Sequence, residues 1–172
     1  MVFRGRTRTS SRLLPLSTMS QDDRWVSGEA WKTVVDSVPL VSVDLIIKHE
    51  DGVLLGLREN EPAKGEWFVP GGIVFKNERL TDAVHRVATT EVGCDVEIQD
   101  QLGVFEHFYE TSDVDGVDSK HYVANGFVVE PIEDQHIEIS DSQHSQLRVA
   151  EPPFDDLHPY VQQYLDEITV DP

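Results

Sequence analysis

The segment between residues 71 and 94 constrains the fold more than any other part of the sequence. It begins with a glycine pair, continues through a polar turn and then places apolar residues at intervals of three and four. Such spacing forms one stripe along a helix, made here of Leu80, Ala83, Val84, Val87 and Ala88. We expect Asn77 to cap this helix and Gly93 to end it. The segment therefore predicts a strand–turn–helix unit whose helix packs its apolar stripe on a sheet.

Strand-like runs lie on both sides of this unit. Residues 39–57 read as two strands joined at a hairpin turn, Asp51-Gly52, and residues 67–75 as a strand interrupted by Pro70 and the glycine pair. Later strands are expected at about 94–109, 121–130 and 146–150, with acidic loops at 112–119 and 131–144. Amphipathic helices are expected at about 22–38 and 158–168. Strands mixed with helices at the start, middle and end predict the α/β class, with a mixed β-sheet sandwiched between helices.

The charge of the chain argues against two classes of partner. The sequence holds 32 acidic and 14 basic residues, for a formal net charge of −18. A surface of this kind repels nucleic acid backbones and anionic membranes, so we expect neither as a partner. The same imbalance fits either an acidic surface selected for solubility or adaptation to molar salt, where self-repulsion is screened. We favour the second interpretation, a halophilic protein.

The first residues differ in composition from the rest. Residues 1–21 contain four arginines and no acidic residue, whereas the chain from Asp22 onward carries 10 basic and 32 acidic residues. Such a start resembles an organelle transit peptide, but an upstream extension before a true start at Met19 is the plainer interpretation. We therefore expect a disordered extension at 1–21 and one domain at 22–172. A single cysteine, Cys94, excludes an internal disulfide and suits the cytoplasm.

Polar residues at fixed positions distinguish this central unit from an ordinary strand–turn–helix. Gly72, Glu78, Arg86, Glu91 and Gly93 have the spacing of the Nudix box, and the segment resembles that family. The resemblance implies a Nudix α/β/α sandwich that hydrolyses a nucleoside diphosphate linked to a second group, with magnesium as cofactor.

Two positions of the box depart from the usual pattern. Nudix boxes commonly place carboxylates where this chain has Val87 and Thr90, so Glu91 stands alone. Carboxylates at those spacings share one helix face and gather several metal ions. One glutamate cannot assemble such a cluster, and we therefore expect a single ion, Mg²⁺ or alternatively Mn²⁺.

The missing carboxylates are typical of one Nudix branch, the GDP-mannose mannosyl hydrolases. The resemblance to this branch runs from about residue 31 to residue 149 and includes "PLVSVDLII", "PAKGEWFVPGG", "HFYE", "KHYVANGF" and "SQH" in the same order. It implies attack on the anomeric carbon of a GDP-sugar, which releases GDP and a sugar of inverted configuration. It also implies a homodimer.

The branch pattern implies a metal site and a general base. The metal ligands would be the backbone carbonyl of Gly72, the carboxylate of Glu91 and the side-chain oxygen of Gln143. His144 follows directly and is the expected base, because an ordinary histidine pKa near 6.5 suits proton abstraction from water at neutral pH.

Further residues match the part of the pattern that handles the leaving group. Arg58, His107 and Tyr122 are expected to bind and stabilise the departing GDP, since a guanidinium matches phosphate oxygens and the other two donate hydrogen bonds. Asp44 lies between apolar residues in a predicted strand, where burial of an unpaired charge is unfavourable. A carboxylate at such a position indicates a functional role. We expect Asp44 to orient the base or to bind the sugar.

Cationic side chains near the box are expected to bind carboxylates of the box and the phosphates of the substrate. Arg86 is expected to pair with Glu78 or Glu91 on the box helix, and to contact the substrate as well. After the glycine pair the branch usually has an arginine that contacts phosphate, and this chain has Ile73. Lys64, in the loop just before that strand, is the expected replacement.

Two other functions stay open at this point. The chain could be an ordinary Nudix pyrophosphohydrolase that splits the P–O–P bond, or a nucleotide-sugar-binding module without catalysis. Convergence of Glu91, Gln143 and His144 with Gly72 around one cavity would favour the hydrolase of GDP-sugars.

Overall fold

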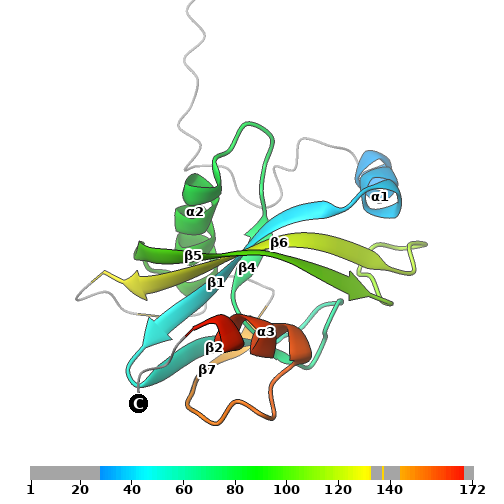
Figure 1. The fold of residues 1–172 in the computed structure, drawn as a ribbon. Helices are drawn as coiled ribbons and strands as arrows, with labels where there is room; N and C mark the ends of the chain where they lie inside the picture. Colours follow the sequence, from blue (N-terminus) through cyan, green and yellow to red (C-terminus); the bar gives the residue numbers. More distant parts are fainter. Residues whose placement is uncertain (1–27, 133–136, 138–143, 169–172) are drawn as a thin grey trace, which may run out of the picture.

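A mixed sheet of seven strands lies at the centre of the protein. The structure is a computed structural model, and it describes residues 28–132, 137 and 144–168. The elements, in chain order, are α1 (Gly28–Ser37), β1 (Leu40–His49), β2 (Gly52–Arg58), β3 (Trp67–Phe68), β4 (Gly71–Ile73), α2 (Leu80–Val92), β5 (Val96–Tyr109), β6 (Lys120–Pro131), β7 (His144–Ala150) and α3 (Pro159–Glu167). Helices α2 and α3 lie on opposite faces of the sheet (Figure 1), which confirms the predicted α/β/α arrangement.

Strand β1 organises the sheet because it pairs with three others. It runs parallel to β6 from Leu40 to Ile47 and antiparallel to β4 over residues 42–44. It also continues through a hairpin into β2, which carries β3 and β7 on its two sides. Alternate residues of β1 face opposite layers, so that Leu45 packs under α2 while Ile46 packs under α3.

Helix α2 buries the apolar stripe that its spacing predicted. Val84, Val87 and Ala88 pack against one face of the sheet and are almost fully buried. Gly93 ends the helix in the left-handed conformation at φ 69°, as expected for a glycine after the last turn.

The predicted start of α2 was wrong. Asn77 adopts a left-handed backbone conformation in the preceding turn, at φ 68°, and the helix begins three residues later with Arg79 in the capping position. The side chain of Arg79 makes no capping hydrogen bond. Instead, the Glu78 carboxylate accepts a hydrogen bond of 2.8 Å from the backbone N–H of Phe75, which fixes the turn.

Several other boundaries shift when the strands pair. The hairpin turn consists of residues 50–51, because His49 pairs with Gly52 and Gly52 begins β2. The run at 67–75 forms two short strands, since β3 pairs with β2 whereas β4 pairs with β1. Strand β7 begins at residue 144 rather than 146, because its pairing with β2 continues as far as Arg58. The part of the predicted first helix at 22–27 lies outside the described residues.

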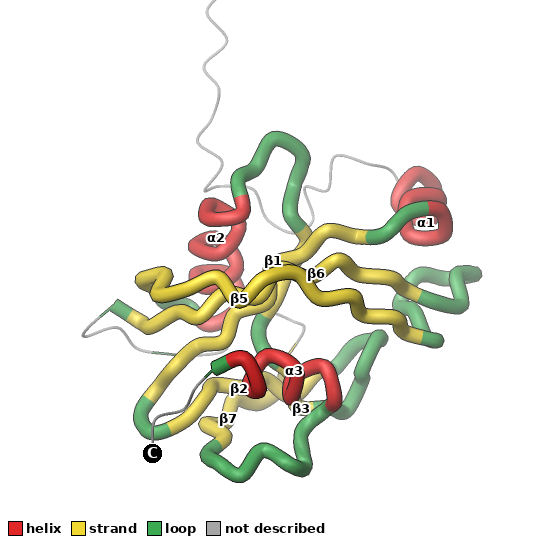
Figure 2. The backbone as a smooth tube through the Cα atoms, viewed as in Figure 1, coloured by secondary structure: helices red, strands yellow, loops and turns green. Residues whose placement is uncertain are grey.

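Helices α3 and α1 pack on different parts of the sheet. Helix α3 places Val161, Tyr164 and Leu165 on the face of the sheet opposite α2. Helix α1 packs Val35 against Leu40 and lies beside the loop that joins β5 and β6 (Figure 2). Among the described residues, no helix is long and apolar enough to cross a membrane.

Candidate functional site

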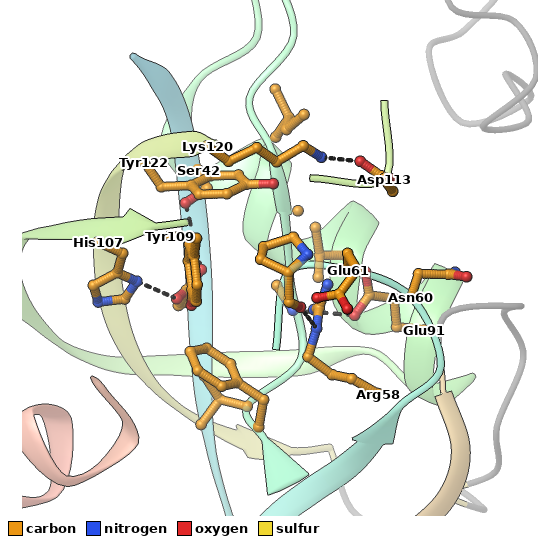
Figure 3. A pocket seen from close by; sticks show the side chains of 18 of the residues that line it. Ser42, Arg58, Asn60, Glu61, Glu91, His107, Tyr109, Asp113, Lys120 and Tyr122 are labelled. Carbon is orange, nitrogen blue, oxygen red and sulfur yellow. Dashed lines mark hydrogen bonds and ion pairs between the residues drawn. The ribbon is translucent and has the colours of Figure 1, made fainter. Parts of the chain in front are cut away.

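A cavity of about 220 Å³ lies between the sheet, α2 and two loops. Its wall is built from strands β1 to β6, helices α1 and α2, and the loops that follow β2 and β5 (Figure 3). Seven of the residues that the sequence singled out line it together: Asp44, Arg58, Gly72, Arg86, Glu91, His107 and Tyr122. These residues come from six different elements, so only the folded sheet brings them into one site.

Three predicted residues are not placed in this cavity. Lys64 is exposed in the loop between β2 and β3 and is not part of the lining, and its role as the replacement cation stays a prediction. His144 is buried as the first residue of β7, beside Arg58 in the strand pairing, rather than on a loop. A Cβ on Gly56 would collide with its imidazole, so a glycine there makes room for the ring. Gln143 lies outside the described residues, and the roles of Gln143 and His144 remain predictions.

The approach of β4 to α2 forms the part of the cavity around Glu91. The Glu91 side chain is 1% exposed and accepts a hydrogen bond of 3.0 Å from the backbone N–H of Gly71. A Cβ on Gly72 would lie 2.8 Å from Cγ2 of Val87 and 3.9 Å from Oε1 of Glu91. Only glycine therefore lets the backbone of β4 come this close to the carboxylate.

This donor set fits one hard cation rather than a cluster of ions. No group of three or more His, Cys, Asp or Glu side chains gathers within the described part of the chain. Val87 is buried in the apolar core, and Thr90 lines the cavity beside Glu91. The Glu91 carboxylate is an oxygen ligand of the kind that magnesium prefers, and water commonly completes the shell of such an ion.

Arg86 is held by groups of the protein itself. Its Nε donates a hydrogen bond of 2.7 Å to Glu78, and a terminal nitrogen donates one of 2.8 Å to the carbonyl of Ile73. The guanidinium also lies 4.1 Å from the centre of the Phe75 ring. The predicted pairing with Glu78 is therefore confirmed, and the side chain fixes the loop between β4 and α2 against the cavity.

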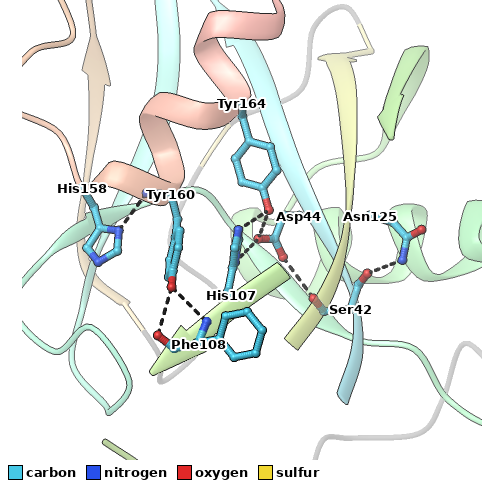
Figure 4. Close-up of polar contacts among 8 residues, drawn as sticks. All are labelled: Ser42, Asp44, His107, Phe108, Asn125, His158, Tyr160 and Tyr164. Carbon is cyan, nitrogen blue, oxygen red and sulfur yellow. Dashed lines mark hydrogen bonds and ion pairs between the residues drawn. The ribbon is translucent and has the colours of Figure 1, made fainter. Parts of the chain in front are cut away.

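Asp44 is buried at the cavity wall with an unusual electrostatic environment (Figure 4). Its carboxylate accepts hydrogen bonds of 2.7 Å from the hydroxyl of Tyr164 and 3.4 Å from that of Ser42. Burial raises the pKa of Asp44 to about 6, although the Tyr164 hydrogen bond and the positive charge of Arg58 act in the opposite direction. The carboxyl group can therefore take up or release a proton close to neutral pH.

His107 lies next to this carboxylate but is electrically neutral. The imidazole is 2% exposed and stacks on the ring of Tyr160 at 4.1 Å. Burial, with a smaller contribution from His158, lowers the pKa of His107 to about 4. Its Nδ1 lies 4.0 Å from Asp44, which is too far for a hydrogen bond. Its Nε2 lies 3.3 Å from the Tyr164 hydroxyl, whose proton goes to Asp44, so at pH 7 the neutral ring donates from Nε2 and leaves Nδ1 as an acceptor.

Arg58 brings a positive charge to the cavity from the end of β2. Its Nε donates a hydrogen bond of 2.8 Å to the carbonyl of Pro62, which orients the guanidinium from the loop side. Figure 3 shows the side chain at the lower part of the cavity, below Glu91 and Asn60. An arginine in this position matches the oxygens of a phosphate group.

The structure adds lining residues that sequence reasoning missed. Tyr109 follows His107 by two positions on β5, and Lys120 precedes Tyr122 by two positions on β6. Because side chains two apart share one face of a strand, this period could have identified both. Asp113, from the loop between β5 and β6, lines the cavity too, and no signal in the sequence separated it from its acidic neighbours.

Comparison with known proteins agrees with the fold and with the box. The NUDIX domain model matches residues 38–169. The chain is 62% identical over 143 residues to the low-salt glycan biosynthesis protein Agl8 of Haloferax volcanii, a match that covers 83% of this chain and 90% of that protein. It is 39% identical over 67 residues to an ADP-ribose pyrophosphatase of Methanocaldococcus jannaschii, which covers 39% of this chain and 40% of that protein.

Solved structures show the same fold at lower sequence identity. The MutT NUDIX hydrolase from Burkholderia pseudomallei superimposes with a TM-score of 0.62 and 24% identity, over 77% of this chain and 100% of that chain. The MutT protein from Methanosarcina mazei superimposes with a TM-score of 0.60 and 21% identity, over 76% of this chain and 93% of that chain.

Proposed function

Because the chain belongs to the NUDIX family of hydrolases, we propose that it hydrolyses a GDP-sugar of the GDP-mannose type at the anomeric carbon. The products are GDP and the free sugar with inverted configuration. The observation that carries this proposal is the helix face at the cavity, where Val87 and Thr90 stand next to Glu91. Several metal ions held by carboxylates are the usual means of activating water against phosphorus. This helix supplies only one carboxylate, which is too few to hold such a group of metal ions.

A single divalent ion suits the leaving group better than the nucleophile. Nudix hydrolases generally use divalent metal ions such as Mg²⁺. In this chain Glu91, the carbonyl of Gly72 and Gln143 would hold Mg²⁺ or Mn²⁺, and the ion would supply positive charge to stabilise the departing diphosphate. The single carboxylate favours this role, because water activation at phosphorus commonly needs a second ion.

The chain's own residues complete the leaving-group site. Arg58 binds diphosphate oxygens from one side of the cavity, while Tyr122 donates a hydrogen bond and His107, which lines the same cavity, helps to shape it. A neutral His107 adds no second full positive charge that would hold the GDP product in the cavity. Asp44, with its pKa of about 6, orients the attacking water or binds the sugar.

The general base of the proposal is His144. It begins β7 directly opposite Arg58 in the sheet, which places it one strand away from the cavity lining. A base at this position and a metal ion at Glu91 would act on different parts of the substrate. His144 is buried and does not line the cavity, so its role as the base rests on the resemblance to the mannosyl hydrolase branch.

The relatives support different parts of the proposal. The Haloferax volcanii protein is named for glycan biosynthesis, and nucleotide-sugars are the donors from which glycans are made. The partial match to an ADP-ribose pyrophosphatase favours the second candidate function, cleavage of the P–O–P bond. The third candidate is nucleotide-sugar binding without catalysis.

Hydrolysis of GDP-mannose in ¹⁸O-labelled water separates the three functions. Attack at the anomeric carbon places the label on the sugar, and proton NMR before mutarotation shows the inverted anomer first. Label in the nucleotide phosphate would instead establish the pyrophosphohydrolase. Binding of GDP-mannose without any hydrolysis in the presence of magnesium would establish the binding module.

A further inference from the structure

A buried lysine lies in the cavity wall near Tyr122 and has no role assigned so far. Lys120 begins β6, and its side chain is 5% exposed. Its ammonium group forms an ion pair with Asp113, whose side chain is 42% exposed. Figure 3 shows the pair at the upper end of the cavity, whereas Arg58 lies at the lower end. Removing an ammonium group from water is costly, so a lysine at this position has a specific use or a strong structural reason.

The fold holds Asp113 in place through the loop between β5 and β6. Val114 and Val117 of this loop pack in the small apolar cluster under α1. The hydroxyl of Ser112 accepts a hydrogen bond of 3.0 Å from the N–H of Val114, and the carbonyl of Val114 accepts one of 3.0 Å from the N–H of Val117. Asp113 therefore sits between two fixed backbone turns, with its carboxylate directed at the lysine.

A second contact joins this loop to the opposite rim of the cavity. The hydroxyl of Thr111 donates a hydrogen bond of 2.9 Å to Glu61, which belongs to the loop after β2. The two loops that carry Asp113 and Glu61 thus meet at the cavity.

Aromatic rings accompany the ion pair. The ammonium group of Lys120 lies 5.9 Å from the centre of the Tyr122 ring, and both side chains project from the same face of β6. Trp31 of α1 lines the same cavity, and it packs in the cluster that holds Tyr122 and Val114. Flat apolar rings next to a donor and an acceptor are suited to a sugar, which has C–H faces and neighbouring hydroxyl groups.

The charges of the pair favour hydroxyl groups over phosphate. A phosphate placed at Lys120 would also lie against the carboxylate of Asp113, and two like charges at such a distance repel. Hydroxyl groups avoid this conflict, because a hydroxyl accepts a hydrogen bond from the ammonium group and its neighbour donates one to the carboxylate. Arg58 lies at the other end of the cavity and, within the part of the chain that the structure describes, forms no salt bridge, so it is the better phosphate site.

We propose that Asp113 and Lys120 form the sugar subsite of this hydrolase, where they bind neighbouring hydroxyl groups of the hexose and select the sugar. This inference rests on the proposed function, since it assumes a nucleotide-sugar as ligand. It concerns recognition of the sugar and is independent of which bond the enzyme breaks.

The test compares binding of GDP with binding of GDP-mannose. Both dissociation constants are measured by displacement of a fluorescent guanine nucleotide, within the time before appreciable hydrolysis. Lys120→Met and Asp113→Asn should each weaken GDP-mannose binding about tenfold or more, the effect of losing a hydrogen bond to a charged group. GDP binding should stay within about twofold of the wild-type value, because the variants leave the diphosphate site unchanged. Asp115→Asn is the matched control, since Asp115 is exposed on the same loop and does not line the cavity.

Three results would overturn the inference. An equal loss of affinity for GDP and GDP-mannose would assign Lys120 to the diphosphate. Unchanged affinity for both ligands, with a lower melting temperature, would make the pair purely structural. If Lys120→Met does not fold, Asp113→Asn still allows the two affinities to be compared. A wild-type protein that binds GDP-mannose no more tightly than GDP would have no sugar subsite. None of these results depends on the position of the ¹⁸O label. The binding test and the labelling test can therefore fail independently, and the two failures are distinguishable.

Discussion

Tyr164 donates a hydrogen bond of 2.7 Å to the carboxylate of Asp44, and this contact joins helix α3 to strand β1 at the cavity wall. The two residues are 120 positions apart in the sequence. Both are buried, so the hydroxyl takes the place of the water that an exposed carboxylate would have. The hydrogen bond lowers the pKa of Asp44, against the larger effect of burial, which raises it.

Replacing Tyr164 should therefore change the pH dependence of catalysis. In Tyr164→Phe the pKa of Asp44 should rise above its value of about 6, because the stabilising donor is lost. If catalysis needs the ionised carboxylate, the acid limb of the kcat/KM profile moves to higher pH. The free energy of unfolding should fall by about 1–3 kcal/mol, as for other buried hydrogen bonds that lose one partner.

Tyr160→Phe is the matched control for this prediction. Tyr160 lies on the same helix, and its hydroxyl exchanges hydrogen bonds of 2.9 Å with the backbone of Phe108 rather than with Asp44. This variant should lose stability without moving the acid limb. An equal shift in both variants, or no shift in either, would contradict the assigned role of Tyr164.

Asp44→Asn should stabilise the protein at neutral pH while reducing its activity. The folded-state pKa of about 6 lies above the ordinary value of 3.8, so the ionised carboxylate is less favourable in the folded protein than in the unfolded chain. This difference corresponds to about 3 kcal/mol. The cost is present above pH 6, shrinks as the pH falls and is absent below about pH 4. The stability advantage of the variant should therefore shrink by about 3 kcal/mol between pH 7 and pH 4.

His107 affects stability in the opposite direction and conceals this cost in the wild-type protein. Its folded-state pKa of about 4 lies below the ordinary 6.5, so acidification through this range adds a proton to the unfolded chain first and lowers stability. Denaturant titrations of wild-type protein and Asp44→Asn at several pH values separate the two effects. The exposed variant Asp115→Asn should follow the wild-type profile. Parallel profiles for Asp44→Asn and wild type would show that the carboxyl group titrates at an ordinary pKa.

The sequence predicted the helix of the box better than the turn before it. Val84, Val87 and Ala88 identify α2 because their spacing requires a helix to bring them onto one face. The position of Asn77 depends instead on the hydrogen bond between Glu78 and Phe75 and on the ion pair between Glu78 and Arg86. These contacts form only when the loop lies against the helix, so capping preferences alone do not locate the helix start.

The sequence predicted a site residue where a charged side chain stands among apolar neighbours. Asp44 stands among apolar residues, and this conflict indicated a function without knowledge of the fold. Lys120 gives no such signal, because a lysine at a strand end is usually solvated. Its burial follows from a loop that packs beneath α1, which is tertiary information. The spacing predicted that Tyr164 lies on the apolar face of its helix. It could not predict the hydrogen bond to Asp44, because that bond depends on how the helix packs on the sheet.

Low salt should destabilise the protein through its acidic surface. From Asp22 onward the chain carries 10 basic and 32 acidic residues, and mutual repulsion of this excess weakens the compact state in dilute buffer. The free energy of unfolding should rise markedly between roughly 50 mM and roughly 2 M KCl, as the screening length falls severalfold. Circular dichroism during denaturant titration measures this change. Equal stability at the two concentrations would remove the argument for adaptation to high salt.

Two substitutions on α2 should separate metal binding from packing. Glu91→Gln preserves the shape of the side chain and an acceptor for the N–H of Gly71, so the fold should persist while activity falls by orders of magnitude. Val87→Ala, one turn earlier, removes buried methyl groups that pack against Gly72 and should cost about 1–3 kcal/mol of stability. Calorimetric titration with Mg²⁺ and thermal unfolding measure the two effects independently. If both variants lost stability and kept wild-type magnesium affinity, α2 would serve the structure alone.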